Sequence, residues 1–168
     1  DVARALRAGA VVVTPSIYPL YDPTNAPPEV LVPVASAAEE GSSALFVSGI
    51  DPGWGNDILP ILATGLAGTI DEIRCQEIFD YSTYDQPDSV RYLIGMGQPM
   101  DYEPPMVAPT IPTMVWGGQV RLIARALGVE LDEIRETLDR RALDTTVTNG
   151  MGDFEAGTQG ALRFEVQG

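Results

Sequence analysis

A glycine-rich segment carries the residues best suited to chemistry. Residues 49–57 read GIDPGWGND, and glycines let a backbone turn with positive φ or approach a ligand closely. Asp51 offers a carboxylate there, beside the expected N-terminus of a helix. The pattern also fits a plain connection in which Asn56 or Asp57 caps that helix. Trp54 could be a pocket wall or a core anchor. We take Asp51 as a candidate proton-transfer residue, and Trp54 and Asn56 as candidate substrate contacts.

A second candidate segment, residues 14–21, reads TPSIYPLY and follows the β-branched run AVVVT. Its two prolines favour extended backbone, so Ser16, Tyr18 and Tyr21 could present hydroxyls to a ligand. Loop tyrosines are also common as half-buried packing residues. Tyr18 and Tyr21 are candidate catalytic residues on the first interpretation.

A third cluster, EIFDYSTYDQP at residues 77–87, combines carboxylates with phenols. Neighbouring carboxylates can shift each other's pKa for acid–base work, although most such runs form a solvated face. On the functional interpretation Glu77, Tyr81 and Tyr84 contact the substrate.

The absence of two residue types excludes several kinds of site. The chain has no histidine, and all ten basic residues are arginine. Within these residues there is therefore no Ser/His/Asp triad, no histidine-bearing zinc site, no Schiff-base lysine and no Walker-type lysine. We expect no metal ion.

Composition and charge indicate a globular domain of 168 residues. A net charge of −14 repels a phosphate backbone, so we expect no nucleic-acid partner. No apolar run approaches the ~20 residues of a membrane-spanning helix, so no membrane association is expected. Cys75 is the only cysteine, and no secretory leader opens the chain, which favours a cytoplasmic location.

The first 50 residues have the rhythm of a doubly wound α/β sheet. Residues 10–14 and 44–47 are short apolar runs typical of fully buried parallel strands, and residues 29–40 repeat apolar positions at helical spacing. Ligands collect beyond the carboxyl ends of such strands, which places residues 14–21 at a site. Fifty residues are too few to close a parallel sheet, so we expect an N-terminal portion to be missing.

The remaining residues predict an α+β region with a mostly antiparallel sheet. We expect a helix near 57–67, a strand near 71–81 with Cys75 in the core, and an amphipathic helix from Trp116 to Leu127. Residues 134–143 suit a strand or a helix. The last strand places Leu162, Phe164 and Val166 on one apolar face, which could pack against a helix or a second subunit.

Five segments in order resemble one family. They are VVTPS, ALFVSGIDPGWGNDILP, EIFDYSTYD, the Trp116 helix with LGVELDEI, and EAGTQGALRFEV. Together they resemble the dihydrodipicolinate reductase-like proteins related to 2,4-diaminopentanoate dehydrogenase and the native amine dehydrogenases. The resemblance implies the end of a Rossmann-type dinucleotide-binding domain at residues 1–50 and an α+β substrate and oligomerisation domain at residues 51–168.

The same resemblance implies an oxidoreductase dependent on NAD or NADP. It would transfer a hydride between the nicotinamide and a small amine, imine or carbonyl substrate, and a homodimer is expected. The implied cofactor contacts are Thr14, Pro15, Ser16, Gly49, Pro52 and Gly53.

Two departures from the family pattern shape the expected chemistry. Authentic dihydrodipicolinate reductases use a histidine- and lysine-bearing motif that this chain lacks, so that activity is not expected. Characterised amine dehydrogenases carry a glutamate after the strand equivalent to 10–14, where this chain continues Ser16-Ile17-Tyr18. A tyrosine such as Tyr18 or Tyr21, a carboxylate such as Asp51 or Glu77, or a bound water would then carry the proton, and Asp51 is the first choice. The alternative is a non-catalytic member that serves ligand sensing or oligomerisation.

Overall fold

The computed structural model describes all 168 residues, which divide into two units. Unit 1 comprises residues 1–76, 114–132 and 168, and unit 2 comprises residues 77–113 and 133–167. The chain thus enters unit 2 twice. None of the helices has the length and apolar character needed to traverse a lipid bilayer.

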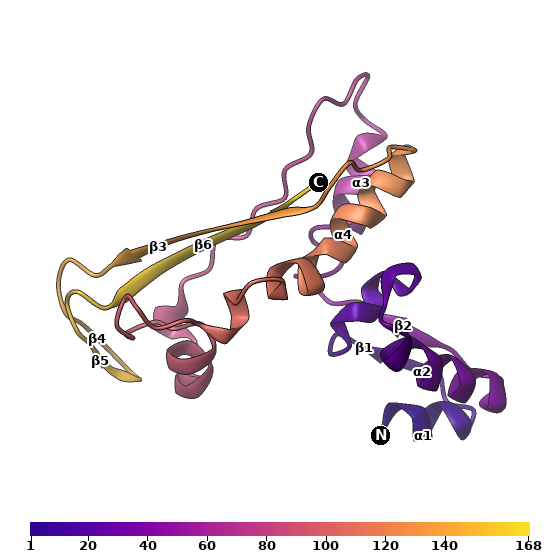
Figure 1. The fold of residues 1–168 in the computed structure, drawn as a ribbon, viewed down its shortest axis with the longest axis horizontal. Coiled ribbons are helices and arrows are strands. Elements are labelled where there is room, and N and C mark those ends of the chain that lie inside the picture. Colours follow the sequence, from indigo (N-terminus) through magenta and orange to yellow (C-terminus); the bar gives the residue numbers. More distant parts are fainter. The chain divides into compact units, whose positions relative to one another are not determined.

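Unit 1 begins with an α/β arrangement of two helices and two strands. The elements are α1 (Val2–Arg7), β1 (Val12–Thr14), α2 (Pro28–Gly41) and β2 (Leu45–Val47), with the short turns η1 (Tyr18–Tyr21) and η2 (Pro23–Asn25) after β1 (Figure 1). β1 and β2 pair in parallel, with Val12 opposite Leu45. The predicted strands and the helix near 29–40 are confirmed.

The two helices of this part pack closely against each other. Leu6 and Ala37 are fully buried. A Cβ atom on Gly41 would overlap the backbone of Leu6, so only glycine permits this approach. The Ser43 hydroxyl donates a hydrogen bond of 2.8 Å to the Leu6 carbonyl. Burying a leucine side chain stabilises a fold by about 1.5–3 kcal/mol, which makes Leu6 the anchor of this packing.

The parallel strands are covered on one face only, which corrects the prediction of fully buried strands. Val13 is 67% exposed and Phe46 is 57% exposed, whereas their neighbours Val12 and Leu45 are half-buried. Successive side chains of a strand point to opposite faces. The continuous apolar run therefore does not correspond to burial on both faces within unit 1.

Two further helices follow, α3 (Ile58–Thr64) and α4 (Ile111–Leu127). Asp57 caps α3 by accepting from the Ile58 amide, and Gly128 ends α4 with φ of +68°. The predicted strand near 71–81 is wrong, because this segment pairs with no other strand and has irregular backbone. Cys75, expected in the core, is exposed.

Unit 2 contains an antiparallel sheet and a hairpin. β3 (Arg135–Ala142) pairs with β6 (Gln159–Gln167), with Leu138 opposite Phe164, and β4 (Val147–Asn149) pairs with β5 (Gly152–Phe154) (Figure 1). The alternative for residues 134–143 is therefore decided in favour of a strand. Three short helical turns, η3 (Tyr81–Thr83), η4 (Ser89–Leu93) and η5 (Pro105–Val107), complete the unit. The α/β then α+β arrangement is confirmed at this level.

Glu136 caps the first residues of α4, which up to Thr113 belong to unit 2, as Glu136 does. Glu136 accepts hydrogen bonds from the Thr110 amide at 2.5 Å, the Thr113 amide at 3.0 Å and the Thr113 hydroxyl at 2.8 Å. Burial alone would raise the pKa of Glu136, but these bonds outweigh it and lower the pKa. The ionised Glu136 therefore fixes the entry into α4.

Candidate active site

The two segments expected to flank a ligand lie against each other in unit 1. The Tyr21 hydroxyl donates a hydrogen bond of 2.7 Å to the Pro52 carbonyl. A Cβ atom on Gly49 would lie 3.2 Å from that hydroxyl and 3.3 Å from the Pro15 Cβ. Thr14 ends β1, and Gly49 follows β2 by two residues. The segments thus meet at the carboxyl ends of the two parallel strands.

The turn at residues 49–57 depends on glycine at position 53. Gly53 has φ of +142°, and a Cβ atom there would overlap the backbone of Gly49. The Trp54 amide donates to the Gly49 carbonyl at 2.9 Å, and the Gly55 amide donates to the Ile50 carbonyl at 3.0 Å. The Asp51–Pro52 peptide bond is cis. Asp51 therefore lies within a tight turn that backbone hydrogen bonds hold closed.

Asp51 is held by one of its two carboxylate oxygens. Its Oδ1 accepts a hydrogen bond of 2.7 Å from the Trp116 indole Nε1 and another from the Asn56 amide Nδ2. Asn56 Oδ1 in turn accepts from the Gln119 amide and, at 3.2 Å, from the Gly53 backbone. The other oxygen, Oδ2, accepts no hydrogen bond from the protein. Because no buried side-chain oxygen lacks a hydrogen-bond partner, Oδ2 is accessible to solvent. Asp51 can therefore accept a proton or a cationic donor at Oδ2.

Tyr21 remains a hydrogen-bond donor across the neutral pH range. Burial, followed by the charges of Asp57, Tyr18 and Asp51, raises the pKa of Tyr21 to about 12. Asp57 itself is 4% exposed, and burial raises the pKa of this carboxyl against the opposing hydrogen bond from the Ile58 amide. The site thus combines a protonated phenol with acidic groups.

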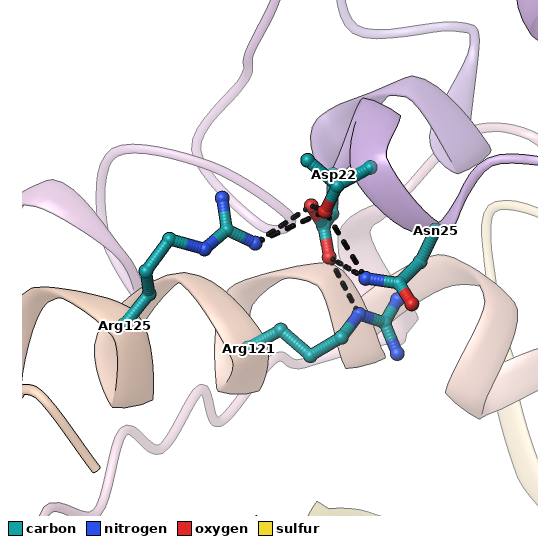
Figure 2. A network of polar contacts seen from close by, with 5 residues as sticks. Asp22, Asn25, Arg121 and Arg125 are labelled. Atoms are coloured by element: carbon teal, nitrogen blue, oxygen red, sulfur yellow. Dashed lines mark hydrogen bonds and ion pairs between the residues drawn. The ribbon is translucent and has the colours of Figure 1, made fainter. Parts of the chain in front are cut away.

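A buried carboxylate next to Tyr21 connects this segment to α4. The Asp22 side chain is 2% exposed and binds Arg121 Nε at 2.7 Å and Arg125 Nη2 at 2.9 Å (Figure 2). Thr24 and Asn25 donate further bonds of 2.6 and 2.8 Å. We call these five residues the Asp22 cluster.

The Asp22 cluster keeps its carboxylate ionised. Burial by itself raises the pKa of Asp22, but the hydrogen bonds from Thr24, Arg125, Arg121 and Asn25 together hold the pKa far below its usual range. The two guanidinium groups approach the carboxylate from successive turns of α4, and both point at it (Figure 2). The buried carboxylate therefore has two cationic partners, and the cluster carries one net positive charge.

α4 is the element that joins the two segments. Trp116 and Gln119 hold the 49–57 turn, while Arg121 and Arg125 hold Asp22. A Cβ atom on Gly118 would lie 3.2 Å from the Tyr21 Cβ, so glycine lets the helix approach η1 closely. The helical periodicity of the sequence predicts only an apolar face around Trp116, so these polar contacts were not predicted. The spacing of Trp116 and Gln119, and of Arg121 and Arg125, places each pair on one side of the helix and could have signalled them.

The other predicted residues of unit 1 surround this turn with different exposure. Thr14 Oγ1 accepts from the Ser16 amide at 3.1 Å, and Pro15 and Ser16 are exposed. Tyr18 is 41% exposed and Trp54 is 48% exposed. These side chains are accessible to a ligand, while Gly49, Pro52 and Gly53 serve the turn itself. Their cofactor and catalytic roles stay predictions.

Two of the predicted substrate contacts in unit 2 belong to an aromatic cluster. Tyr81 and Tyr84 pack with Phe79 as a cluster of three rings, whose centroids lie 4.7, 5.8 and 5.9 Å apart. The closest pair is tilted and the other two meet edge to face, which are favourable aromatic geometries. Glu77 begins this part of unit 2. The substrate-binding roles of Glu77, Tyr81 and Tyr84 stay predictions.

A curated protein of Streptomyces virginiae named amine dehydrogenase is 75% identical over 169 residues, which include all of this chain. The chain spans 47% of the length of that relative. No family model matches the chain.

Proposed function

We propose that this chain belongs to an NAD(P)-dependent oxidoreductase that acts on small amines. The observation that carries the proposal is the 75% identity, over the whole chain, with a protein named amine dehydrogenase. The resemblance of the five sequence segments supports the same function. The reaction would oxidise an amine to an imine with NAD(P)+ as hydride acceptor, and water would then hydrolyse the imine to a carbonyl compound and ammonia. In the reverse direction the carbonyl compound and ammonia would condense to the imine with loss of water, and NAD(P)H would reduce it.

The fold supports a site at the carboxyl ends of β1 and β2. Open parallel sheets bind ligands there, and the Tyr21–Pro52 contact lies at that edge. The exposed apolar positions Val13 and Phe46 favour a larger parallel sheet, so we assign residues 1–50 to the end of a Rossmann-type domain. Residues 51–168 would then form the substrate domain.

The residues at this edge suit the nicotinamide end of a dinucleotide. Thr14, Pro15 and Ser16 are uncharged, and Pro15 and Ser16 are exposed beyond β1. The bound cofactor would supply hydride acceptance and donation at its C4 carbon. We propose NAD or NADP as the cofactor, a homodimer as the assembly and a cytoplasmic location.

We propose that Asp51 accepts the proton that the amine nitrogen releases. In oxidation the substrate carbon loses a hydride, the C–N single bond becomes a double bond, and nitrogen loses a proton. Asp51 Oδ2 is placed to accept that proton, because Oδ1 is already held by Trp116 and Asn56. Tyr21, whose hydroxyl donates to the Pro52 carbonyl, would orient the turn, and we propose that Tyr18, a partly exposed residue, passes the proton to solvent.

Cofactor binding and a substrate panel test this proposal. The complete protein that carries this chain is titrated with NADH and NADPH, and absorbance of the reduced nicotinamide is followed with amines, ketones plus ammonia, and alcohols. We expect binding of at least one cofactor and turnover of an amine. Failure to bind either cofactor would refute the oxidoreductase, and binding without turnover across the panel would favour the non-catalytic alternative.

A further inference from the structure

The contacts of α4 suggest that residues outside the reacting groups set the geometry of the site. α4 holds the 49–57 turn through Trp116 and Gln119, and it holds the Tyr21 segment through the Asp22 cluster. Tyr21 joins these two segments directly, because its hydroxyl donates a hydrogen bond of 2.7 Å to the Pro52 carbonyl. Asp51 therefore lies in a ring of contacts in which each segment is held by the other two.

Asp22 is the strongest connection in this ring. It is 2% exposed, directly follows Tyr21, and accepts hydrogen bonds from both guanidinium groups of α4 (Figure 2). Thr24 and Asn25 fill its remaining acceptor positions from within its own segment. Charge-assisted hydrogen bonds are roughly twice as strong as neutral ones, so Asp22 fixes the register of η1 along the helix.

We propose that Asp22 is a positioning residue: by binding Arg121 and Arg125 it holds Tyr21 against the Asp51–Pro52 turn and so keeps Asp51 aligned for reaction. This inference rests on the proposed oxidoreductase function for its catalytic consequence. Asp22 contacts neither the substrate nor the cofactor in this account. Its effect passes through Tyr21 and α4 to Asp51.

The expected effect is on alignment rather than on affinity. A displacement of about 1 Å in a reacting group can cost about 100-fold in rate. For Asp22→Asn we expect kcat to fall by about 10- to 100-fold, with the KM for the cofactor changed by less than about threefold. Arg125→Gln, which removes a half-exposed partner, should give a smaller fall and keeps the test available if Asp22→Asn folds poorly.

Hydrogen exchange provides a measurement that does not depend on activity. In the complete protein, Asp22→Asn should accelerate amide exchange in residues 14–25 and 49–57 by about tenfold, while α1 and α2 exchange as in the wild type. Glu40→Gln is the matched control, because it removes the exposed Arg7–Glu40 ion pair of the same unit. That control should leave exchange at the site and kcat unchanged.

The outcomes separate the positioning role from the proposed function. Unchanged exchange in residues 49–57 of both Asp22→Asn and Arg125→Gln would overturn the positioning role, whatever the activity. Faster exchange with unchanged kcat would also overturn it. If the wild type binds neither cofactor, the proposed function fails, and the exchange comparison still decides whether Asp22 orders the turn.

Discussion

Acid should destabilise this protein because it protonates Asp22. The expected decrease in the free energy of unfolding follows from the contacts of the Asp22 cluster. The folded state holds the pKa of Asp22 far below the value of about 3.9 expected in the unfolded chain. A lowered pKa in the folded state means that the stabilisation is complete above pH 4 to 5. It is lost progressively as the pH falls below the unfolded value toward the folded one.

The size of the effect follows from the hydrogen bonds that Asp22 accepts. Removing one partner of a buried ion pair typically costs about 3–5 kcal/mol. The side chains of Arg121 and Arg125 are 25% and 52% exposed, so water can partly compensate them. We therefore expect Asp22→Asn to lower the free energy of unfolding by about 2–3 kcal/mol at pH 7. The Asn amide also places a donor against the donors of the cluster.

The pH dependence distinguishes loss of charge from loss of packing. Between pH 6 and pH 3, ionisation of Asp22 in the wild type should contribute about 1.3 kcal/mol less stability, and the variant has no such term. The gap between wild type and Asp22→Asn should narrow by that amount, measured by urea unfolding at each pH with Glu40→Gln as control. A gap that stays constant over this range would refute the electrostatic account of the cluster.

Three further predictions concern other parts of the structure. Gly53→Ala should lower the free energy of unfolding by about 2 kcal/mol or more, because φ is +142° and the Gly49 backbone leaves no room for a Cβ atom. Urea unfolding measures this loss, and a variant as stable as the wild type would contradict it. Trp116→Phe removes one hydrogen-bond donor to Asp51 and should lower kcat by about 10- to 100-fold. Cofactor affinity, measured by fluorescence titration, should stay the same. An unchanged kcat would argue against the role of this hydrogen bond. Glu136→Gln should lower the free energy of unfolding by about 1 kcal/mol at pH 7 and by less at pH 4. The reason is that Glu136, whose pKa is lowered in the fold, stabilises the protein only when it is ionised. An equal loss at both pH values would contradict this prediction.

The sequence predicted the elements whose signals are local. The β-branched run before Pro15 and the run before Ser48 formed β1 and β2, and the apolar spacing that ends at Gly128 formed most of α4. These features depend on side-chain period and on residues that end an element, which are readable within a few positions.

The failed predictions concern interactions between distant residues. The alternating apolar residues near 71–81 suit a strand, but a strand also needs an edge to pair with, and none pairs with it in the structure. The Asp51–Trp116 bond joins residues 65 apart in sequence, and the Asp22–Arg121 bond joins residues 99 apart. No local pattern identifies such partners, so the sequence did not predict that α4 holds Asp51.

The most direct test of this account is the turnover of Asp51→Asn in the complete protein. Amine oxidation is followed at the absorbance of the reduced nicotinamide, and cofactor affinity is measured in the same preparations. We expect kcat to fall by about 100-fold or more with the cofactor dissociation constant unchanged, because the amide cannot accept the substrate proton at Oδ2. Asp71→Asn, at an exposed position of the same unit, serves as the matched control. Near-normal turnover by Asp51→Asn would contradict the account and leave Asp51 as a structural residue of the turn.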